Sequence, residues 1–253
     1  MLSAVCKQKY YSSEDLACLD KTCLPKHISI IPDGNRRWAK NEHTQVKEGH
    51  RQGGDTLIET VKAAKELGIE TITFYLFSTE NWKRPQEEVY ALMWLLDTFL
   101  TDQCPFMVEE GIRLWTIGTL ESFPEHVQQT IANTKTATAH CHTINMVFAL
   151  NYGGRDEICR AVKKIVDKCA AGELQKEQID ETTLSQQMDT AHFGDPDLWI
   201  RTSGEMRMSN FLLWQLSYAE LYFSPVLWPD FQSIHLLDAV IAYQKRQRRW
   251  GGT

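Results

Sequence analysis

Short apolar runs alternate along this chain with longer stretches whose apolar residues recur every three or four positions. This alternation predicts strands and amphipathic helices in turn, and therefore a single α/β domain with a parallel sheet. The runs expected to form strands cover residues 28–31, 70–77, 112–117, 143–149 and 197–201. The stretches expected to form helices cover residues 57–67, 89–100, 124–140, 158–166 and 233–249.

Other segments lack a clear period. Residues 1–24 are expected to be a flexible lead-in or a short helix, ahead of a domain that spans residues 25–253. Residues 39–48 are polar and predict a loop, so the glycine-rich stretch 49–54 is expected to lead into the helix that follows. Residues 172–194 are predicted to lie on the surface.

Composition limits the class of protein. A length of 253 residues with 43% hydrophobic content suits one large domain with a full core. The formal net charge of −6 argues against general nucleic-acid binding, which usually shows a basic excess. No run approaches the roughly 18 apolar residues of a membrane span, and acidic residues interrupt the first 24 positions, where a signal peptide would be apolar. We therefore expect a cytoplasmic protein.

The seven cysteines are odd in number and include no Cys-x-x-Cys pair, which is typical of reduced thiols. His140-Cys141-His142 would supply half of a zinc site. No second pair of ligands lies at zinc spacing, so the sequence does not favour a zinc site here.

A polar cluster directly follows the first predicted strand, which Pro32 ends because proline has no backbone N–H. The cluster consists of Asp33, Gly34, Asn35, Arg36 and Arg37. In open α/β sheets ligands bind outside the carboxyl ends of the strands, and a carboxylate beside two guanidiniums suits a metal together with a phosphate. The alternative is a plain surface turn, since Asp, Gly and Asn are common turn residues.

Further polar groups follow later strands and would share that edge of the sheet. His50, flanked by glycines near an expected helix start, is a candidate phosphate donor, and the alternative is a core histidine. Arg201, Arg207 and Ser209 would form a second anion clamp, and the alternative is a solvated surface. The loop after strand 70–77 is unusually rich in hydroxyl, amide, aromatic and charged side chains for a connector. It contains Ser78, Thr79, Glu80, Asn81, Trp82, Lys83 and Arg84. Residues 151–156 form another such cluster.

The apolar stripe along residues 89–100 is most simply a core face. If the protein handles a long hydrocarbon, this stripe and the strand at 70–77 are the candidate walls of a tunnel. Leu76 lies at the end of that strand, and alternation alone leaves open whether it faces the tunnel or the core.

With these residues in view, the sequence resembles the cis-prenyltransferases, the undecaprenyl diphosphate synthase family. The resemblance runs from about His27 to the C-terminus and rests on six ordered blocks. The blocks are residues 33–39, 49–50, 77–85, 151–155, 200–205 and 209–223.

The resemblance implies a central, mostly parallel six-stranded sheet flanked by helices, with a hydrophobic product tunnel. It implies an enzyme that condenses isopentenyl diphosphate with an allylic diphosphate, expected to be farnesyl diphosphate, and creates a cis double bond at each step. The expected product is undecaprenyl diphosphate, a cell-wall lipid carrier. The resemblance also implies Mg²⁺ as cofactor, a homodimer, and peripheral membrane contact for product release, with no nucleic-acid partner.

The family's residue roles carry over by position. Asp33 would bind the metal that helps the allylic diphosphate depart, Glu220 would be a second metal-site carboxylate, and Asn81 would be the proton acceptor. Trp38 and Trp82 would line the reacting chain. The allylic diphosphate would be held by Gly34, Arg36, Arg37 and His50, and isopentenyl diphosphate by Arg201, Arg207 and Ser209. Substrate contacts are also expected from Asn35, Ser78, Thr79, Glu80 and Arg84. Arg249-Trp250-Gly251 matches the C-terminal Arg-x-Gly that reaches the partner's site.

The chain departs from the family pattern at three positions. Pro32 stands where Met is common, and Val46 stands where a phosphate-binding Arg is common, with Lys47 as a candidate substitute. Met206 stands where a metal-linked His is common, and a thioether is a poor ligand for Mg²⁺. The chain has no Asp-Asp pair, which argues against the Asp-rich motif of trans-prenyl synthases.

Two other functions stay open. The first is a non-catalytic relative that supports a partner subunit, although such relatives lack the motif carboxylate that Asp33 supplies. The second is an unrelated phosphate-binding protein or phosphohydrolase, which would not need the long apolar stripe.

Overall fold

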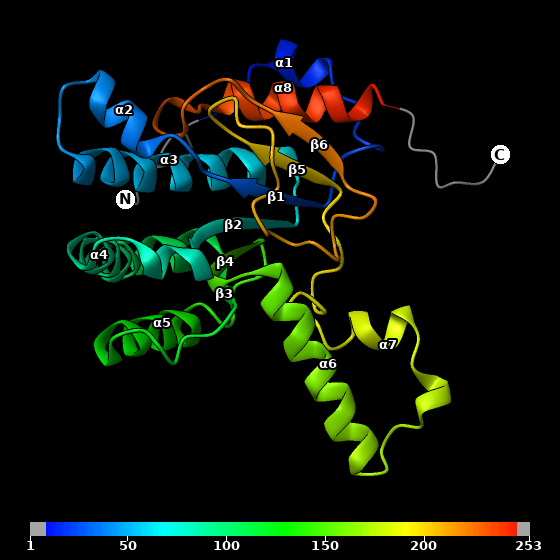
Figure 1. Ribbon diagram of the computed structural model, residues 1–253. Coiled ribbons are helices and arrows are strands. Elements are labelled where there is room, and N and C mark those ends of the chain that lie inside the picture. The colour runs from blue at the N-terminus through cyan, green and yellow to red at the C-terminus, as the bar shows by residue number, and fades with distance from the viewer. Residues whose placement is uncertain (1–8, 247–253) are drawn as a thin grey trace, which may run out of the picture.

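The computed structural model describes residues 9–246, and its centre is one six-stranded sheet (Figure 1). The strands are β1 (His27–Ile31), β2 (Thr71–Ser78), β3 (Ile112–Ile117), β4 (Ile144–Tyr152), β5 (Leu198–Arg201) and β6 (Glu220–Phe223). They lie in the order β3-β4-β2-β1-β5-β6, and every neighbouring pair is parallel. The five strands expected from the apolar runs are confirmed, and the sixth agrees with the family resemblance. Because all strands run one way, their carboxyl ends meet at a single edge.

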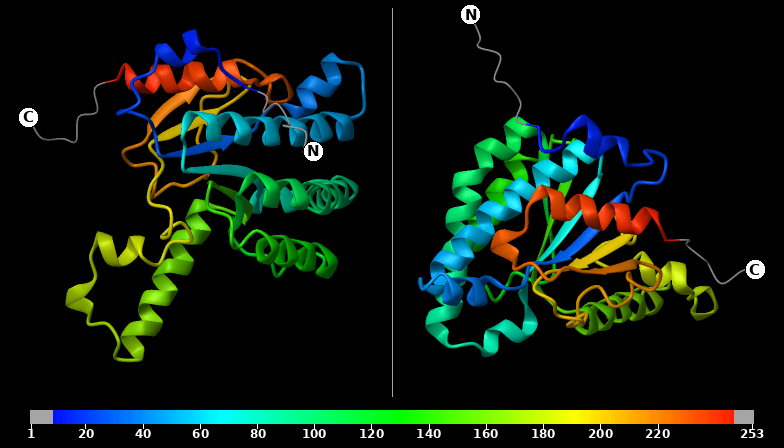
Figure 2. Two further views of the ribbon diagram at one scale, coloured as in Figure 1. Left: turned by 180° about the vertical axis from the view of Figure 1, so that it is seen from behind. Right: turned by 90° about the horizontal axis from the view of Figure 1, so that it is seen from above.

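Helices cover one face of this sheet over the main hydrophobic core (Figures 1 and 2). Ile30, Phe74 and Phe148 supply the sheet side of that core. The helices that pack on it are α3 (Val46–Leu67), α4 (Gln86–Glu110), α5 (Glu125–Ala137) and α8 (Ser233–Gln244). Burial of these apolar side chains is the main source of stability for the fold.

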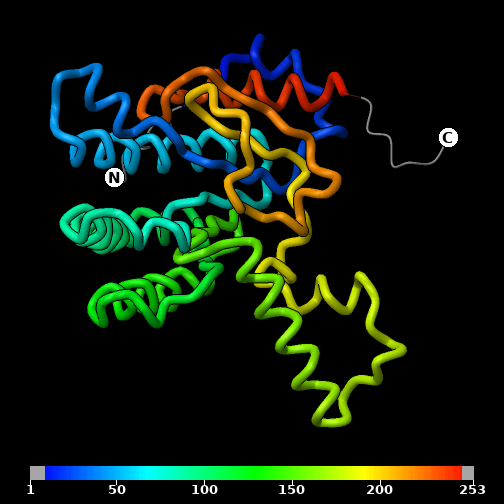
Figure 3. The backbone as a smooth tube through the Cα atoms, in the orientation of Figure 1, coloured from blue at the N-terminus to red at the C-terminus, as the bar shows by residue number. Residues whose placement is uncertain are grey.

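The opposite face carries a smaller core. Val147, Ala149 and Trp199 point to this side and are covered by a segment that includes Phe211 and Leu216. Next to it, α6 (Gly154–Ala170), η2 (Lys176–Gln178) and α7 (Glu181–Ser185) extend away from the body of the molecule (Figures 1 and 3).

The segment ahead of β1 contains a short helix, α1 (Ser13–Ala17), so the helical alternative for this segment is the one found. Tyr11 is buried in the main core, and its hydroxyl donates to the carbonyl of Ser233 at 3.2 Å. The side chain of Gln244 accepts from the N–H of Asp20 at 3.1 Å. Figure 1 shows α1 lying beside α8.

The expected loop at 39–48 is wrong at both ends. The short helix α2 (Asn35–Asn41) occupies its start, and α3 already begins at Val46. The glycines of 49–54 therefore lie inside α3. A Cβ at Gly49 would collide with the carbonyl oxygen of Asn35, so this glycine permits close packing of α3 on α2. His50 is consequently in the second turn of a helix and not at its start.

Several helix ends also differ from prediction: α4 continues to Glu110, and α6 extends past 158–166 at both ends. The helix predicted to end at 140 stops at Ala137, and α8 ends at Gln244. Residues 247–249 of the predicted last helix lie outside the described part of the chain. Among residues 9–246, no helix is both long and apolar enough to cross a membrane.

Candidate active site

A cavity of about 1080 Å³ lies at the carboxyl edge of the sheet. Ligand cavities in proteins commonly measure ~300 to 1,000 Å³, so this one has room for a large ligand. Polar residues from the ends of β1, β2 and β5 line one part of it. Apolar residues from β2, α3 and α4 line the rest.

The apolar part of the cavity lies between β2 and the two long helices. Its walls include Leu57 of α3 and, from α4, Leu92, Met93, Leu96 and Phe99. Tyr75, Leu76 and Phe77 all line it, although neighbours in a regular strand point to opposite faces. The register with β4 shifts between Tyr75 and Phe77, and a bulge of this kind re-aims side chains. The structure thus places Leu76 on the cavity wall.

Asp33 is fixed in place from both sides. Its N–H donates to the hydroxyl of Thr202 at 2.8 Å, and its carbonyl accepts from the N–H of Trp228 at 3.0 Å. Gly34 follows with a φ of 116°, and a Cβ there would lie 3.0 to 3.1 Å from Leu227 and Trp228, which only glycine avoids. The carboxylate of Asp33 therefore has one defined place at the end of β1.

Two guanidiniums face that carboxylate. Arg201 donates to it at 2.9 Å, and Arg37 lies 3.6 Å from it. Arg201 is only 3% exposed and also donates to the hydroxyl of Ser209 at 2.6 Å and to the carbonyl of Arg207. Arg201, Arg37 and Arg207 together face two carboxylates, Asp33 and Glu205, so this group keeps one unbalanced positive charge, which favours an anion in the cavity.

A second group of cations lies on the α2 and α4 side of the cavity. Glu88 accepts from Arg84 at 2.8 Å and lies 3.5 Å from Arg36. Both arginines line the cavity, although the whole chain is acidic. The positive charge is therefore concentrated at this site.

His50 lines the same part of the cavity. The side-chain amide of Asn35 lies 3.3 Å from its Nδ1, and with the N–H₂ of that amide facing Nδ1 the ring proton lies on Nε2. Nε2 is buried and has no partner among the described residues. Burial, together with the nearby Arg84, lowers the pKa of His50 from 6.5 to about 4. His50 is thus a neutral donor that lacks an acceptor, as an anion-binding histidine requires.

Most of the predicted site residues share this cavity. Those that line it are Asp33, Gly34, Asn35, Arg36, Arg37, His50, Ser78, Glu80, Asn81, Arg84, Arg201, Arg207 and Ser209. Asn81 also accepts from the N–H of Ser78 at 3.0 Å, which caps the short helix η1 (Thr79–Lys83).

Four predicted residues do not line the cavity. Trp38 donates to Asp230 at 2.7 Å, and Trp82 donates to Asn151 at 2.8 Å and packs on Phe77. Glu220 starts β6, opposite the first residue of β5, and pairs with Arg246 at 2.8 Å. It therefore lies at the edge of the sheet away from Asp33. Thr79 lies beside Gly153.

Of the three departures from the family pattern, Pro32 lines the cavity, whereas Val46 and Met206 do not. Val46 and Met206 are 39% and 77% exposed, and Lys47 is also exposed. None of Val46, Lys47 and Met206 lines the cavity. Arg249, Trp250 and Gly251 lie outside the described residues.

Sequence analysis missed three residues that complete the site. Glu88 bridges two arginines, and Glu205 pairs with Arg37 at 3.1 Å and with Arg207. Glu88 could have been found from its position four residues after Arg84, the spacing at which opposite charges pair on a helix. Asn210 also lines the cavity, and its signal was its place directly after Ser209.

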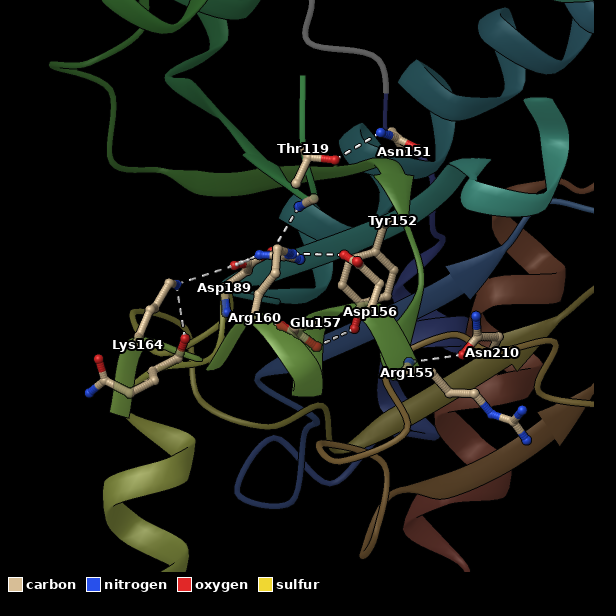
Figure 4. A network of polar contacts seen from close by, with 12 residues as sticks. Thr119, Asn151, Tyr152, Arg155, Asp156, Glu157, Arg160, Lys164, Asp189 and Asn210 are labelled. Atoms are coloured by element: carbon tan, nitrogen blue, oxygen red, sulfur yellow. Dashed lines mark hydrogen bonds and ion pairs between the residues drawn. The ribbon is translucent and has the colours of Figure 1, made fainter. Parts of the chain in front are cut away.

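A buried polar network lies behind the site (Figure 4). Glu157 is 1% exposed and accepts from the hydroxyl of Tyr152, the amide of Gln215 and the N–H of Asp189. Burial raises the pKa of Glu157, and the hydrogen bonds from Tyr152 and Gln215 oppose that shift. Arg160 donates two bonds of 2.8 Å to Asp189. The network thus joins the end of β4 to the base of the α6–α7 extension.

The carboxylates at the site suit a metal ion that is bound jointly by the protein and by a substrate. Among residues 9–246, no three His, Cys, Asp or Glu side chains form a metal-binding group. Asp33 lines the cavity with its carboxylate beside the guanidiniums of Arg201 and Arg37. Mg²⁺ is commonly held by one or two carboxylates plus substrate phosphates, so the residues present fit it.

Comparison with known proteins gives a consistent result. Residues 31–251 match the model of the undecaprenyl diphosphate synthase family. The isoprenyl transferase of Bacillus subtilis (strain 168) is 45% identical over 242 residues, covering 96% of this chain and 92% of that protein. The ditrans,polycis-undecaprenyl-diphosphate synthase ((2E,6E)-farnesyl-diphosphate specific) of Micrococcus luteus is 44% identical over 229 residues, covering 90% of this chain and 92% of that protein.

A solved structure is similar over nearly the whole chain. It is lavandulyl diphosphate synthase from Lavandula x intermedia in complex with dimethylallyl diphosphate. The TM-score is 0.89 at 36% sequence identity, with 91% of this chain and 100% of that chain covered.

Proposed function

The chain belongs to the undecaprenyl diphosphate synthase family of isoprenyl transferases, and from this premise we propose that it condenses isopentenyl diphosphate with farnesyl diphosphate to build undecaprenyl diphosphate. One observation supports this proposal most directly. Two groups of anion-binding side chains flank Asp33 at the polar end of a cavity whose other walls are apolar. Two diphosphates and a growing hydrocarbon need this combination.

The two groups divide the substrates between them. The allylic diphosphate would bind at Arg36, Arg37 and His50, whose Nε2–H lacks an acceptor. Isopentenyl diphosphate would bind at Arg201, Arg207 and Ser209. In both places the incoming phosphate oxygens replace the carboxylates that now pair with the guanidiniums, since charge-assisted bonds to phosphate are at least as strong.

Mg²⁺ held between Asp33 and a diphosphate would stabilise the negative charge that develops on the leaving group. The protein's own residues orient the reactants around that charge. Asn81, which lines the cavity, would contact the hydrogen that isopentenyl diphosphate loses. Leu76 and Phe99 would guide the product away from the polar end and exclude water from the reacting carbon.

The product length is set by the apolar walls and not by the fold alone. A structure at a TM-score of 0.89 bears the name lavandulyl diphosphate synthase, a different product. That protein was solved with dimethylallyl diphosphate, which supports an allylic diphosphate as the first substrate here.

We also propose a homodimer that contacts the cytoplasmic face of a membrane. Val162 and Val166, one turn apart on α6, are 46% and 58% exposed, and a second copy of the chain would cover them. Tyr90 and Trp94, one turn apart on α4, are 58% and 61% exposed, and Trp94 lines the cavity. Aromatic side chains of this kind suit a lipid interface, where an apolar product leaves.

The decisive experiment uses labelled isopentenyl diphosphate with farnesyl diphosphate and Mg²⁺, followed by extraction of the lipid and separation by chain length. A ladder that ends at eleven isoprene units supports the proposal. Full incorporation into shorter chains would refute undecaprenyl diphosphate as the product. No incorporation by the purified chain, but stimulation of a second subunit, would identify a non-catalytic partner.

A further inference from the structure

The loop that carries Ser209 has an uncommon backbone. Ser209, Asn210 and Leu212 have φ values of 50°, 63° and 47°, in the left-handed region that residues other than glycine rarely adopt. Strain of this kind persists only where the surroundings hold it, and it concentrates at functional sites. The contacts of Asn210 show what holds it.

Asn210 makes three hydrogen bonds with two other segments. Its carbonyl accepts from the N–H of Gly154 at 2.7 Å, and its Oδ1 accepts from the N–H of Arg155 at 3.0 Å. Its Nδ2 donates to a carboxylate oxygen of Glu80 at 2.9 Å. Because a backbone N–H only donates, the bond from Arg155 fixes which way the amide points (Figure 4).

The start of α6 is therefore already capped from within the protein. The N–H groups of Gly154 and Arg155 both donate to Asn210, so these two groups of the polar cluster at 151–156 position this residue. Gly153 leaves just enough room for this arrangement. A Cβ there would lie 2.8 Å from Nδ2 of Asn210 and 2.8 Å from the hydroxyl of Thr79.

Ser209, which precedes Asn210, points toward Arg201 and not toward α6. The hydroxyl of Ser209 accepts from Arg201 at 2.6 Å, and Arg201 donates to Asp33 at 2.9 Å. Asn210 thus connects to the loop after β2 through Glu80. Ser209, next to it, connects to the end of β5 through Arg201 and, beyond it, to the end of β1 through Asp33. The carboxylate of Glu80 is engaged in this link: burial raises its pKa, but bonds from its own N–H and from Asn210 outweigh that effect and leave the pKa lowered.

We propose that Asn210 is a positioning residue, which holds Ser209 and Arg201 in their anion-binding arrangement and fixes them relative to the loop at 78–84. The inference rests on the proposed function, in which Ser209 and Arg201 bind isopentenyl diphosphate and Asn81 stands in that loop. Asn210 contacts no reacting atom in this scheme. It sets the separation between the bound isopentenyl group and the residues that act on it.

The test exchanges the two partners of one hydrogen bond. Asn210→Asp places two carboxylates against each other, and we expect isopentenyl diphosphate to bind about tenfold more weakly, because a bond to a charged group is lost and a repulsion added. Glu80→Gln alone keeps an acceptor for Asn210, and because Glu80 also lines the cavity, the affinity of this single variant is measured as the reference for the double variant. The double variant Asn210→Asp with Glu80→Gln restores the bond with its polarity reversed, and its affinity should return to within about threefold of the original.

Binding is measured by calorimetry with isopentenyl diphosphate and Mg²⁺ in the absence of an allylic partner, so no turnover is needed. Thermal unfolding of each variant shows that it is folded. Asn133→Asp adds the same charge on the exposed face of α5 and is the matched control, with unchanged affinity expected. Gly153→Ala, which crowds Nδ2 of Asn210, should weaken binding in the same way as Asn210→Asp.

Steady-state kinetics then separate positioning from general damage. In Asn210→Asp the KM for isopentenyl diphosphate should rise about tenfold, and that for the allylic substrate less than about twofold. A double variant as weak as Asn210→Asp, or equal losses for both substrates, would overturn the inference. A wild-type chain that binds isopentenyl diphosphate but never elongates a prenyl chain would contradict the proposed function alone.

Discussion

Asp33→Asn is the substitution that most directly tests the metal assignment. It keeps the size of the side chain and removes the carboxylate that faces Arg201 at 2.9 Å and Arg37 at 3.6 Å. Loss of metal-assisted charge stabilisation should lower kcat by ~10³-fold or more, which corresponds to about 4 kcal/mol of the barrier.

The fold should survive this change. Arg201 keeps its bonds to Ser209 and to the carbonyl of Arg207, and Arg37 keeps Glu205 at 3.1 Å. Asp33 is partly exposed, so the lost charge-assisted bond should cost about 1 to 2 kcal/mol of unfolding free energy. For a chain of this size, that corresponds to a Tm lower by ~2 to 8 °C.

A binding measurement separates the metal role from general damage. Without Mg²⁺, inorganic pyrophosphate should bind the variant ~3- to 10-fold more tightly than the wild type, because one negative charge near the anion sites is gone. With Mg²⁺, the gain in affinity that the wild type shows should disappear. The assay is calorimetric titration of pyrophosphate with and without the metal, beside kcat at saturating Mg²⁺.

The matched control is Asp156→Asn, which removes another carboxylate–arginine pair, to Arg160 at 2.7 Å, on α6 outside the cavity lining. It should change neither kcat nor the effect of Mg²⁺ on binding. Near-normal turnover of Asp33→Asn, or an unchanged gain in pyrophosphate affinity on adding Mg²⁺, would refute the assignment.

Three other substitutions test separate parts of the molecule. Arg207→Ala should raise the KM for isopentenyl diphosphate about tenfold or more and that for the allylic substrate far less; equal effects would show that the two sites are wrongly divided. Leu76→Ala enlarges the apolar cavity and should lengthen the product ladder without slowing the first condensation, and an unchanged ladder from a folded variant would exclude Leu76 as a length determinant. Burial lowers the pKa of His27 from 6.5 to about 4, so the unfolded state binds more protons and the unfolding free energy should fall by ~3 kcal/mol as the pH falls from 6.5 to 4. Urea denaturation over that range should show a shallower pH dependence for His27→Gln, and an unchanged slope would contradict this reasoning.

The sequence predicted the sheet well because its strands are buried on both faces. Runs such as 71–77 and 146–149 consist of apolar, aromatic or β-branched residues, a pattern typical of a parallel strand that is covered on both faces. The meeting of Asp33 and Arg201 at one edge of the sheet was also predictable, because both residues come at the carboxyl ends of apolar runs.

The errors came from contacts between elements that are remote in sequence. The glycines at 49 and 53 suggested the start of a helix, whereas Gly49 lies against Asn35 and Gly53 against Trp228. Local propensity disfavours glycine within a helix, and here close packing outweighs it. The face of Leu76 was undecidable because the bulge beside it breaks the alternation on which such a prediction rests. Glu220 was expected to be a second metal-site carboxylate on the basis of resemblance alone, and the register of β6 places it at the edge of the sheet away from Asp33.

The place of β1 in the middle of the sheet has a consequence for biosynthesis. β1 pairs with β2 on one side and with β5, some 170 residues later, on the other, and Asp33 is then held by Thr202 and Trp228. While the ribosome is still making the middle of the chain, β1 is an exposed edge rich in isoleucine, the kind of edge that other chains can pair with. The cavity's carboxylate gains its final position only when almost the whole polypeptide has emerged. Nascent and C-terminally truncated chains should therefore depend on chaperones far more than the finished enzyme does.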